Sequence, residues 1–219
     1  MIKDSYYDFR CVAEFHKKFK LPGIGFTSNL RGIDYPTLRF RYRFLREELS
    51  ELEEATTPVK VLDALIDFVY VAHGTALFLG VTPQNSHIAN IWEASGELRS
   101  FKVSRREAGL QGLLNPIDRK YIVDSISREL VAFYNWQLSP ISAYYHLYKA
   151  TKLAYQAAIL LEFPWEKCWD LVHNANMKKE RAAEDASNSK RKSSLDVIKP
   201  PNWVSPEPKM KEVLERAGF

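Results

Sequence analysis

The chain has 219 residues, of which 46% are hydrophobic and 13% aromatic, enough for a substantial core in one large or two small domains. The net charge of +4 is small but unevenly spread, because carboxylates concentrate at 47–67 while Lys and Arg crowd 178–192, a run suited to nucleic acid or to the phosphates of a small ligand. The two cysteines, Cys11 and Cys168, are far apart and not in CxxC spacing, which argues against a disulfide framework or a zinc site and fits a reducing cytoplasm.

Apolar residues recur at helical spacing through most of the chain, and Gly, Pro and Asn interrupt them at intervals. Loop-forming residues fill 21–36 between the first two helices. The predicted helices span residues 4–19, 37–55, 59–79, 84–95, 117–137, 140–161 and 164–185, with a short terminal helix from about 209. No segment is convincing as a strand, and DVIK at 196–199 is an isolated β-like run. We therefore predict an all-α helical bundle.

Two stretches of the chain resemble each other. Residues 71–90 and 153–176 each read as an apolar helix, a turn with proline and a helix ending in His-x-Ala-Asn. The matching positions are His87, Ala89 and Asn90 in one copy and His173, Ala175 and Asn176 in the other. A duplicated helical hairpin is one interpretation, and chance similarity between helices is the other.

The predicted hairpin at 45–80 carries the most unusual charge pattern. Its first arm holds Glu47, Glu48 and Glu51 at helical i, i+3 and i, i+4 spacing, and its second, very apolar arm holds Asp63 and Asp67 one turn apart. A buried, unpaired carboxylate is costly, so two of them need a reason. If the short link at 56–59 folds the arms antiparallel, the acidic faces meet.

Converging carboxylates repel one another unless a hard cation joins them, and Mg²⁺ or Mn²⁺ prefers oxygen ligands. The hairpin therefore predicts a metal site. The glutamates taken alone fit equally well on a solvated helix face, but that interpretation does not explain the acids of the apolar arm.

No membrane segment is expected. The longest apolar run, Phe68–Val81, is too short to span a bilayer, and the first ten residues show no signal-peptide pattern. We expect a cytoplasmic protein.

Several motifs together resemble one family. FLREELSELEEA, DALIDFVYVAHGTALFLG, PWEKCWDLVHNANMKKERA and DVIKPPNW occur in the order found in MazG-like, all-α nucleoside triphosphate pyrophosphohydrolases, and EFHKKFKLP resembles the opening of their phage-type branch, which is related to phosphoribosyl-ATP pyrophosphohydrolase. The resemblance covers about 14–80 and 163–204. The family pattern is Glu-Glu-x-x-Glu followed by Glu-x-x-Asp, and this chain departs from it at Ala64, where Asp63 is the nearest substitute.

The resemblance implies an enzyme that converts an NTP or dNTP and water into the monophosphate and pyrophosphate. It implies Mg²⁺, or Mn²⁺, held by Glu48, Glu51, Asp63 and Asp67, which would neutralise the triphosphate and activate water. Glu47 and Glu48 are the predicted catalytic residues, and Glu47 or Asp63 would accept the proton of the water.

Other site residues are predicted on the same grounds. Asn176 and Lys179 match an Asn-x-x-Lys pattern, and Lys199 matches a lysine of the tail that closes over phosphates. The predicted phosphate-binding residues are Asn176, Lys179, Lys190, Arg191 and Lys199, and the predicted base pocket contains Phe15, His16 and Trp203. Asn176 and Lys179 could instead lie at an exposed helix end, and the tail that carries Lys199 could be disordered. Phe15 and His16 could pack in the core, and Trp203 could simply cap the fold.

The resemblance also sets the expected organisation. We expect residues 1–186 to be a single all-α catalytic domain, with about 81–150 as an insertion or degenerate repeat, and 187–219 to be an extended basic tail that folds back. The expected partners are the nucleotide and further copies of the chain, in a dimer or tetramer; we do not expect nucleic acid. The compartment would be the cytoplasm of a host cell if a phage encodes the protein.

Three other functions compete with this one. A di-iron helical protein needs Glu-x-x-His on two helices, which this sequence lacks. A catalytically impaired helical binding or interaction protein is permitted by Ala64, but the retained acids argue against it. Nucleic-acid binding through 178–192 could also accompany catalysis.

Overall fold

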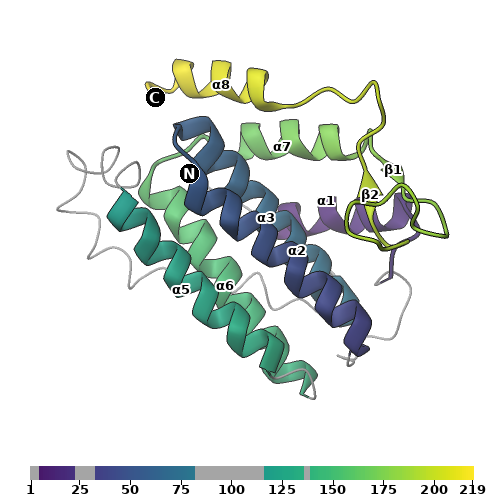
Figure 1. The fold of residues 1–219 in the computed structure, drawn as a ribbon. Helices are drawn as coiled ribbons and strands as arrows, with labels where there is room; N and C mark the ends of the chain where they lie inside the picture. Colours follow the sequence, from purple (N-terminus) through teal and green to yellow (C-terminus); the bar gives the residue numbers. More distant parts are fainter. Residues whose placement is uncertain (1–4, 23–32, 82–115, 136–138) are drawn as a thin grey trace.

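Helices dominate the structure, a computed structural model that describes residues 5–22, 33–81, 116–135 and 139–219 (Figure 1). The helices are α1 (Ser5–Lys18), α2 (Tyr35–Glu54), α3 (Pro58–Phe78), α5 (Pro116–Asn135), α6 (Pro140–Leu160), α7 (Trp165–Asn176) and α8 (Glu207–Arg216), and the strands are β1 (Glu180–Arg181) and β2 (Val197–Ile198). This content confirms the predicted all-α class. The helix predicted at 84–95, with His87, Ala89 and Asn90, lies outside the described residues.

Capping side chains fix where three helices begin. Asp34 precedes α2 and accepts a hydrogen bond from the Thr37 amide at 2.9 Å. Thr57 caps α3 and Ser139 caps α6 in the same way, and a proline stands in the first turn of each. α3 and α6 begin within one residue of their predicted starts, and α2 begins two residues before its predicted start.

Two antiparallel hairpins form the main body of the fold. α2 packs on α3 and α5 on α6, while α2 also contacts α5 and α3 contacts α6. α1, α7 and α8 pack against α3 as well, so α3 lies at the centre (Figure 1). The side-by-side hairpins are compatible with an internal duplication, which stays a prediction.

The central position of α3 explains its apolar sequence. By length and composition α3 would suffice to cross a membrane, so the expectation that no segment is long enough was wrong on that criterion. However, 89% of its most apolar window is buried inside the protein, as in the core helix of a soluble protein. The apolar character of α3 therefore gives no support to a membrane association.

The last long helix ends earlier than predicted. α7 stops at Asn176, whereas the sequence pattern extended it to 185. The segment beyond it forms β1, which pairs antiparallel with β2, so the expectation of no strand was also wrong at these residues. Arg181 Nη1 donates to the carbonyls of Phe19 and Lys20, each at 3.1 Å, and such tertiary contacts override local helix propensity.

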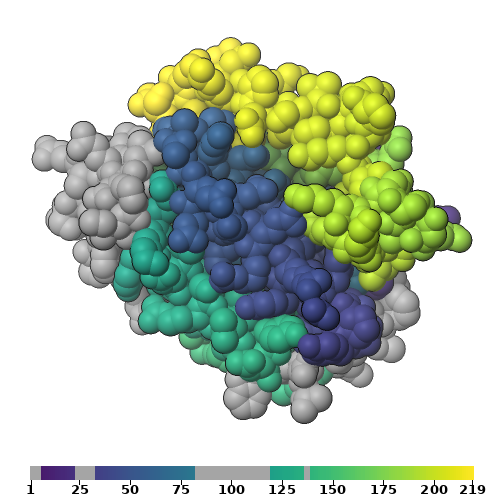
Figure 2. All heavy atoms as spheres, viewed as in Figure 1, coloured from purple at the N-terminus to yellow at the C-terminus, as the bar shows by residue number. Residues whose placement is uncertain are grey.

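The C-terminal segment lies against the helices. α8 begins at Glu207, close to the predicted start, and packs on α3 and α7. Figure 2 shows this yellow segment covering the end of the α2–α3 hairpin. The division into a domain and a tail at residue 186 stays a prediction.

Candidate active site

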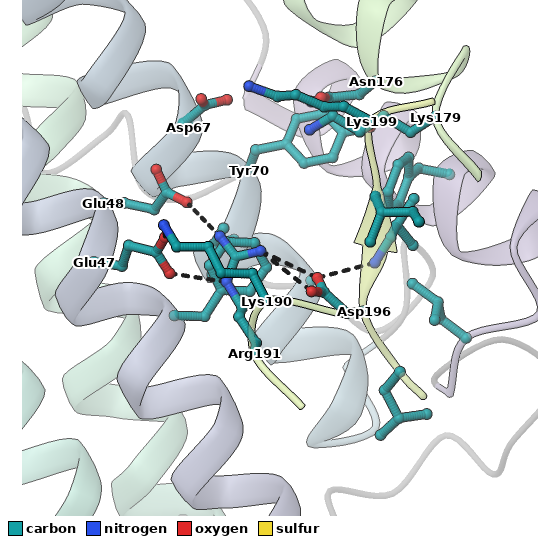
Figure 3. A pocket seen from close by; sticks show the side chains of 18 of the residues that line it. Glu47, Glu48, Asp67, Tyr70, Asn176, Lys179, Lys190, Arg191, Asp196 and Lys199 are labelled. Atoms are coloured by element: carbon teal, nitrogen blue, oxygen red, sulfur yellow. Dashed lines mark hydrogen bonds and ion pairs between the residues drawn. The ribbon is translucent and has the colours of Figure 1, made fainter. Parts of the chain in front are cut away.

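A cavity of about 570 Å³ lies between α1, α2, α3 and the segment that follows α7. Charged side chains of both signs line it. The acids are Glu47, Glu48, Glu51, Asp63, Asp67, Asp196 and Glu207, and the cations are Arg41, Lys179, Lys190, Arg191 and Lys199. Figure 3 shows Glu47, Glu48 and Asp67 of the hairpin on one side of this cavity, and Lys179, Lys199 and Asn176 extending from the other. Lys190 and Arg191 lie beside Glu47 in the same view.

The α2–α3 hairpin sets the order of residues along the cavity. Only residues 55–57 separate the two helices, so they run antiparallel. Glu51 and Asp63 therefore lie toward the link, whereas Arg41 and Gly74 lie toward the far end. The acids of the hairpin therefore line one end of the cavity, and Arg41 and Gly74 line the opposite end.

Burial and mutual repulsion raise the pKa values of the acids. The pKa of Glu48 is raised by burial and then by the charges of Asp67 and Glu51. Burial, followed by the charge of Asp67, raises the pKa of Asp63 to about 8. Burial also raises the pKa of Asp67, although nearby lysines oppose the effect. Such a cluster is unfavourable unless a proton or a cation joins it.

Arg191 joins the acids of α2 to the tail. Its Nε lies 2.8 Å from the Glu47 carboxylate and its Nη2 lies 4.0 Å from that of Glu48. Its Nη1 lies 3.1 Å from the buried carboxylate of Asp196. The guanidinium carbon stands 3.8 Å from the centroid of the Phe44 ring, at the distance of a cation–π contact. Arg191 is thus fixed beside the acids by contacts on several sides.

Three lysines complete the positive side of the cavity. Lys190 Nζ lies 3.3 Å from Glu47, but its side chain is 85% exposed and the ion pair is therefore weak. Lys179 and Lys199 place their Nζ atoms 5.7 and 4.4 Å from the centroid of the Trp203 ring. Burial lowers the pKa of Lys179, an effect that a facing carboxylate opposes. The lysines are therefore held close to the acids without neutralising all of them.

Asn176 lines the cavity, whereas Trp203 lies outside its lining. Asn176 is buried in the last turn of α7 and lines the cavity. Trp203 is not among the described residues that line the cavity, and its Nε1 donates to the Ala175 carbonyl at 2.8 Å. Trp203 thus lies against the two lysines and the end of α7, and its predicted part in a base pocket stays a prediction.

The far end of the cavity is more apolar and contains residues that the sequence analysis missed. Phe15 and His16 line it, as do Arg41 and Gly74. Arg41 lies on the same helix face as Phe44 and the acids, at i, i+3 and i, i+7 spacing, so the pattern of α2 could have singled it out. Gly74 carried no such signal, because its importance depends on what packs against it.

The fit of a metal ion can be tested on these side chains. Among the described residues, no three Asp, Glu, His or Cys side chains stand together in a group that could hold a metal ion. The predicted ligands Glu48, Glu51, Asp63 and Asp67 nevertheless line the same cavity, and burial and like charge raise their pKa values. The chemistry of the oxygen donors fits a hard divalent cation, while the tight ligand cluster stays a prediction.

Fold and cavity together define an all-α protein in which carboxylates from a helical hairpin face lysines and an arginine. Residues 12–93, which include the second half of α1 and all of α2 and α3, match the family model described as phosphoribosyl-ATP pyrophosphohydrolase. The chain is thus similar to that family over these residues, which confirms the predicted resemblance. The phage-type branch stays a prediction. No curated protein and no solved structure matches the chain. The family indicates a hydrolase that acts on the pyrophosphate bond of a nucleotide.

Proposed function

We propose that this protein is a metal-dependent nucleoside triphosphate pyrophosphohydrolase that converts an NTP or dNTP into the monophosphate and pyrophosphate. The observation that carries the proposal is the meeting, in one cavity, of five acids from α2 and α3 with cations from the segment after α7. Acids without cations would repel a triphosphate, and cations without acids would give no ligands for a metal ion. The two groups together suit a metal-bound triphosphate.

The proposed roles follow from the positions of the side chains. Glu48, Glu51, Asp63 and Asp67 would hold Mg²⁺, or Mn²⁺, which when bound supplies charge neutralisation and a more acidic water. Lys179, Lys190, Arg191 and Lys199, with the Asn176 amide, would bind the phosphate oxygens and stabilise the negative charge that develops on the pyrophosphate leaving group.

A carboxylate has to accept the proton of the attacking water. Water would add to the α-phosphorus while the bond from this phosphorus to the bridging oxygen breaks, and pyrophosphate leaves with that oxygen. Glu47 is the favoured base, and Asp63 is the alternative. Because the oxygens of Glu47 accept from Arg191 and Lys190, this role requires at least one of the two cations to turn toward the phosphates.

The test is a screen of all common NTPs and dNTPs with Mg²⁺, in which monophosphate and pyrophosphate are both quantified. We expect equal amounts of the two products from at least one nucleotide. Glu48→Gln and Asp67→Asn should abolish turnover, whereas Glu53→Gln, on the exposed side of α2, should retain it. Orthophosphate as the main product, or full activity in either cavity variant, would contradict the proposal.

An impaired binding protein is the competing function, because Ala64 replaces a family glutamate. The same screen separates the two, since a binding protein would retain nucleotide without releasing pyrophosphate. Nucleic-acid binding through 178–192 has less support, because Lys179, Lys190 and Arg191 all line the cavity. A salt-sensitive shift of DNA by the protein would argue for it.

We also propose that the protein assembles as a homo-oligomer, a dimer or a tetramer, in the cytoplasm. The assembly is expected from the family resemblance alone. Light scattering of the purified protein after size-exclusion chromatography gives its mass directly, and a monomer at micromolar concentration would refute the expectation.

A further inference from the structure

The far end of the cavity is placed to meet the nucleobase of a bound nucleotide. Arg41 and Glu51 are ten residues apart on α2, a separation of about 15 Å at the rise of an α-helix. That span is comparable to the length of a nucleoside triphosphate. If the triphosphate lies at the acids, as the proposed function requires, the base reaches Arg41, His16 and Gly74.

Arg41 is a buried cation that is hydrogen-bonded to α3. Its side chain is 4% exposed, and its Nη2 donates to the Val71 carbonyl at 2.7 Å and its Nε to Thr75 Oγ1 at 3.0 Å. None of the ion pairs among the residues that the structure describes involves Arg41. The charges of Asp196 and Glu48 act on it, and its guanidinium carbon stands 5.1 Å from the centroid of the Phe78 ring. Because Arg41 also lines the cavity, its remaining N–H groups are available to an electron-rich oxygen of a ligand.

His16 offers the opposite hydrogen-bonding character. Its Nδ1 lies 2.8 Å from the Pro22 carbonyl, which can only accept, so Nδ1 carries the proton and Nε2 carries a lone pair. Burial lowers the pKa of His16 to about 3, so the ring is neutral at physiological pH. Nε2 is therefore a fixed acceptor.

Gly74 is what allows these two groups to meet at the cavity wall. A Cβ at this position would stand 2.9 Å from His16 Nε2 and 3.0 Å from Arg41 Nη2, closer than such atoms normally approach. Glycine in the middle of a helix is destabilising relative to alanine. Its presence inside the buried helix α3 is explained if the donor and the acceptor must share this space.

We propose that Arg41 and His16 together select a keto nucleobase, guanine, uracil or thymine, over the amino bases adenine and cytosine. In a keto base a ring N–H stands next to a carbonyl: the N–H would donate to His16 Nε2 and the carbonyl would accept from Arg41. In an amino base the exocyclic amine, with its partial positive charge, would stand beside the guanidinium. The proposal rests on the proposed function for the orientation of the nucleotide.

The test measures binding, so that it does not depend on turnover. The probes are the α,β-imido analogues of dGTP, dUTP, dATP and dCTP, titrated calorimetrically with Mg²⁺ present. We expect the keto analogues to bind about tenfold more tightly or better, the range of discrimination that a good pair of hydrogen bonds supplies. Equal binding of all four, or tighter binding of the amino analogues, would overturn the inference.

Variants separate base selection from a general structural role. Gly74→Ala crowds the Arg41 side chain, and Thr75→Val removes its hydrogen-bond acceptor. Each variant should reduce the ratio of keto to amino affinity to near one. His16→Leu should do the same, and His16→Gln, which keeps an acceptor, should restore part of the ratio. Lys190→Gln is the matched control, because it should weaken all four analogues equally and leave the ratio unchanged.

The outcomes also distinguish this inference from the proposed function. Keto-selective binding without release of pyrophosphate would overturn the function and leave the base selection standing. Release of pyrophosphate at equal kcat/KM from nucleotides of all four bases would overturn the base selection alone. If none of the analogues binds, both are overturned. Should His16→Leu fail to fold, the Gly74→Ala and Thr75→Val ratios decide.

Discussion

Arg191 Nε lies 2.8 Å from a carboxylate oxygen of Glu47, a residue 144 positions away in the sequence. The contact attaches the segment after α7 to α2 at the edge of the acidic cluster. Asp196 supports it from the other side, because its buried carboxylate binds Arg191 Nη1 and accepts from Ser189 Oγ at 3.0 Å. The arginine is thus held in place before any phosphate is present, which favours its use as a preorganised positive charge.

Loss of this arginine should therefore cost more than loss of its neighbour. We expect Arg191→Gln to lower kcat/KM for the best nucleotide by about 100-fold, the usual scale for a charge that stabilises a transition state. Lys190→Gln, which removes an 85% exposed side chain, should change it by about threefold or less. Steady-state pyrophosphate release compares the two. Equal effects would show that the fixed position of Arg191 has no special role.

The buried acids of the cavity should lower the stability of the metal-free protein. Because burial raises the pKa of Asp67, its ionised form is disfavoured in the fold. Asp67→Asn removes this charge, so we expect the melting temperature of the metal-free protein to rise by a few degrees, corresponding to about 1 kcal/mol. Thermal denaturation in EDTA measures the change, with Glu53→Gln as the control. A lower melting temperature would mean that the ion pairing with nearby lysines outweighs the repulsion.

Much of the helical framework could be predicted because the signals are local. Prolines and capping side chains such as Thr57 and Ser139 mark helix starts directly in the sequence. The acids of α2 and α3 were also accessible, because carboxylates at i, i+4 spacing inside an apolar segment stand out without any tertiary information. That they line one cavity required only that a short link fold the two helices antiparallel.

The remaining features depend on contacts between distant segments. The end of α7 at Asn176 was missed because the following residues favour a helix locally, whereas Arg181 is tied to carbonyls after α1. The relation of Gly74 to His16 and Arg41 has no local signature either. A glycine in a helix becomes informative only when the side chains that need its space are known.

Metal binding should release protons at neutral pH. The pKa of Asp63 is about 8 without a bound cation, above the ordinary value of 3.8, so its carboxyl is mostly protonated at pH 7. A metal ion requires the ionised form, and so the proton leaves on binding. The apparent affinity for Mg²⁺ should therefore rise as pH increases toward about 8 and level off above it.

Calorimetry in buffers of different ionisation enthalpy counts these protons. We expect a net release on Mg²⁺ binding at pH 7 that becomes smaller in Asp63→Asn. The native protein binds more protons at Asp63 than the unfolded chain between pH 3.8 and about 8, so the metal-free fold should also lose stability from this group as pH rises through that window. A Mg²⁺ affinity that is flat across this range would contradict the assignment of Asp63.

Trp203 should act by positioning the two lysines. Its ring lies under the Nζ atoms of Lys179 and Lys199, while its Nε1 bonds to the end of α7. Trp203→Ala removes the platform, so we expect the KM for the nucleotide to rise about tenfold, with a smaller change in kcat, as the lysines lose a fixed position. Trp203→Phe keeps an aromatic face and should recover most of the loss, although the hydrogen bond to Ala175 is gone. Pyrophosphate release at varied nucleotide concentration gives both constants. If instead both variants lower the melting temperature and leave KM unchanged, Trp203 only closes the end of α7 and has no part in holding the phosphate-binding side chains.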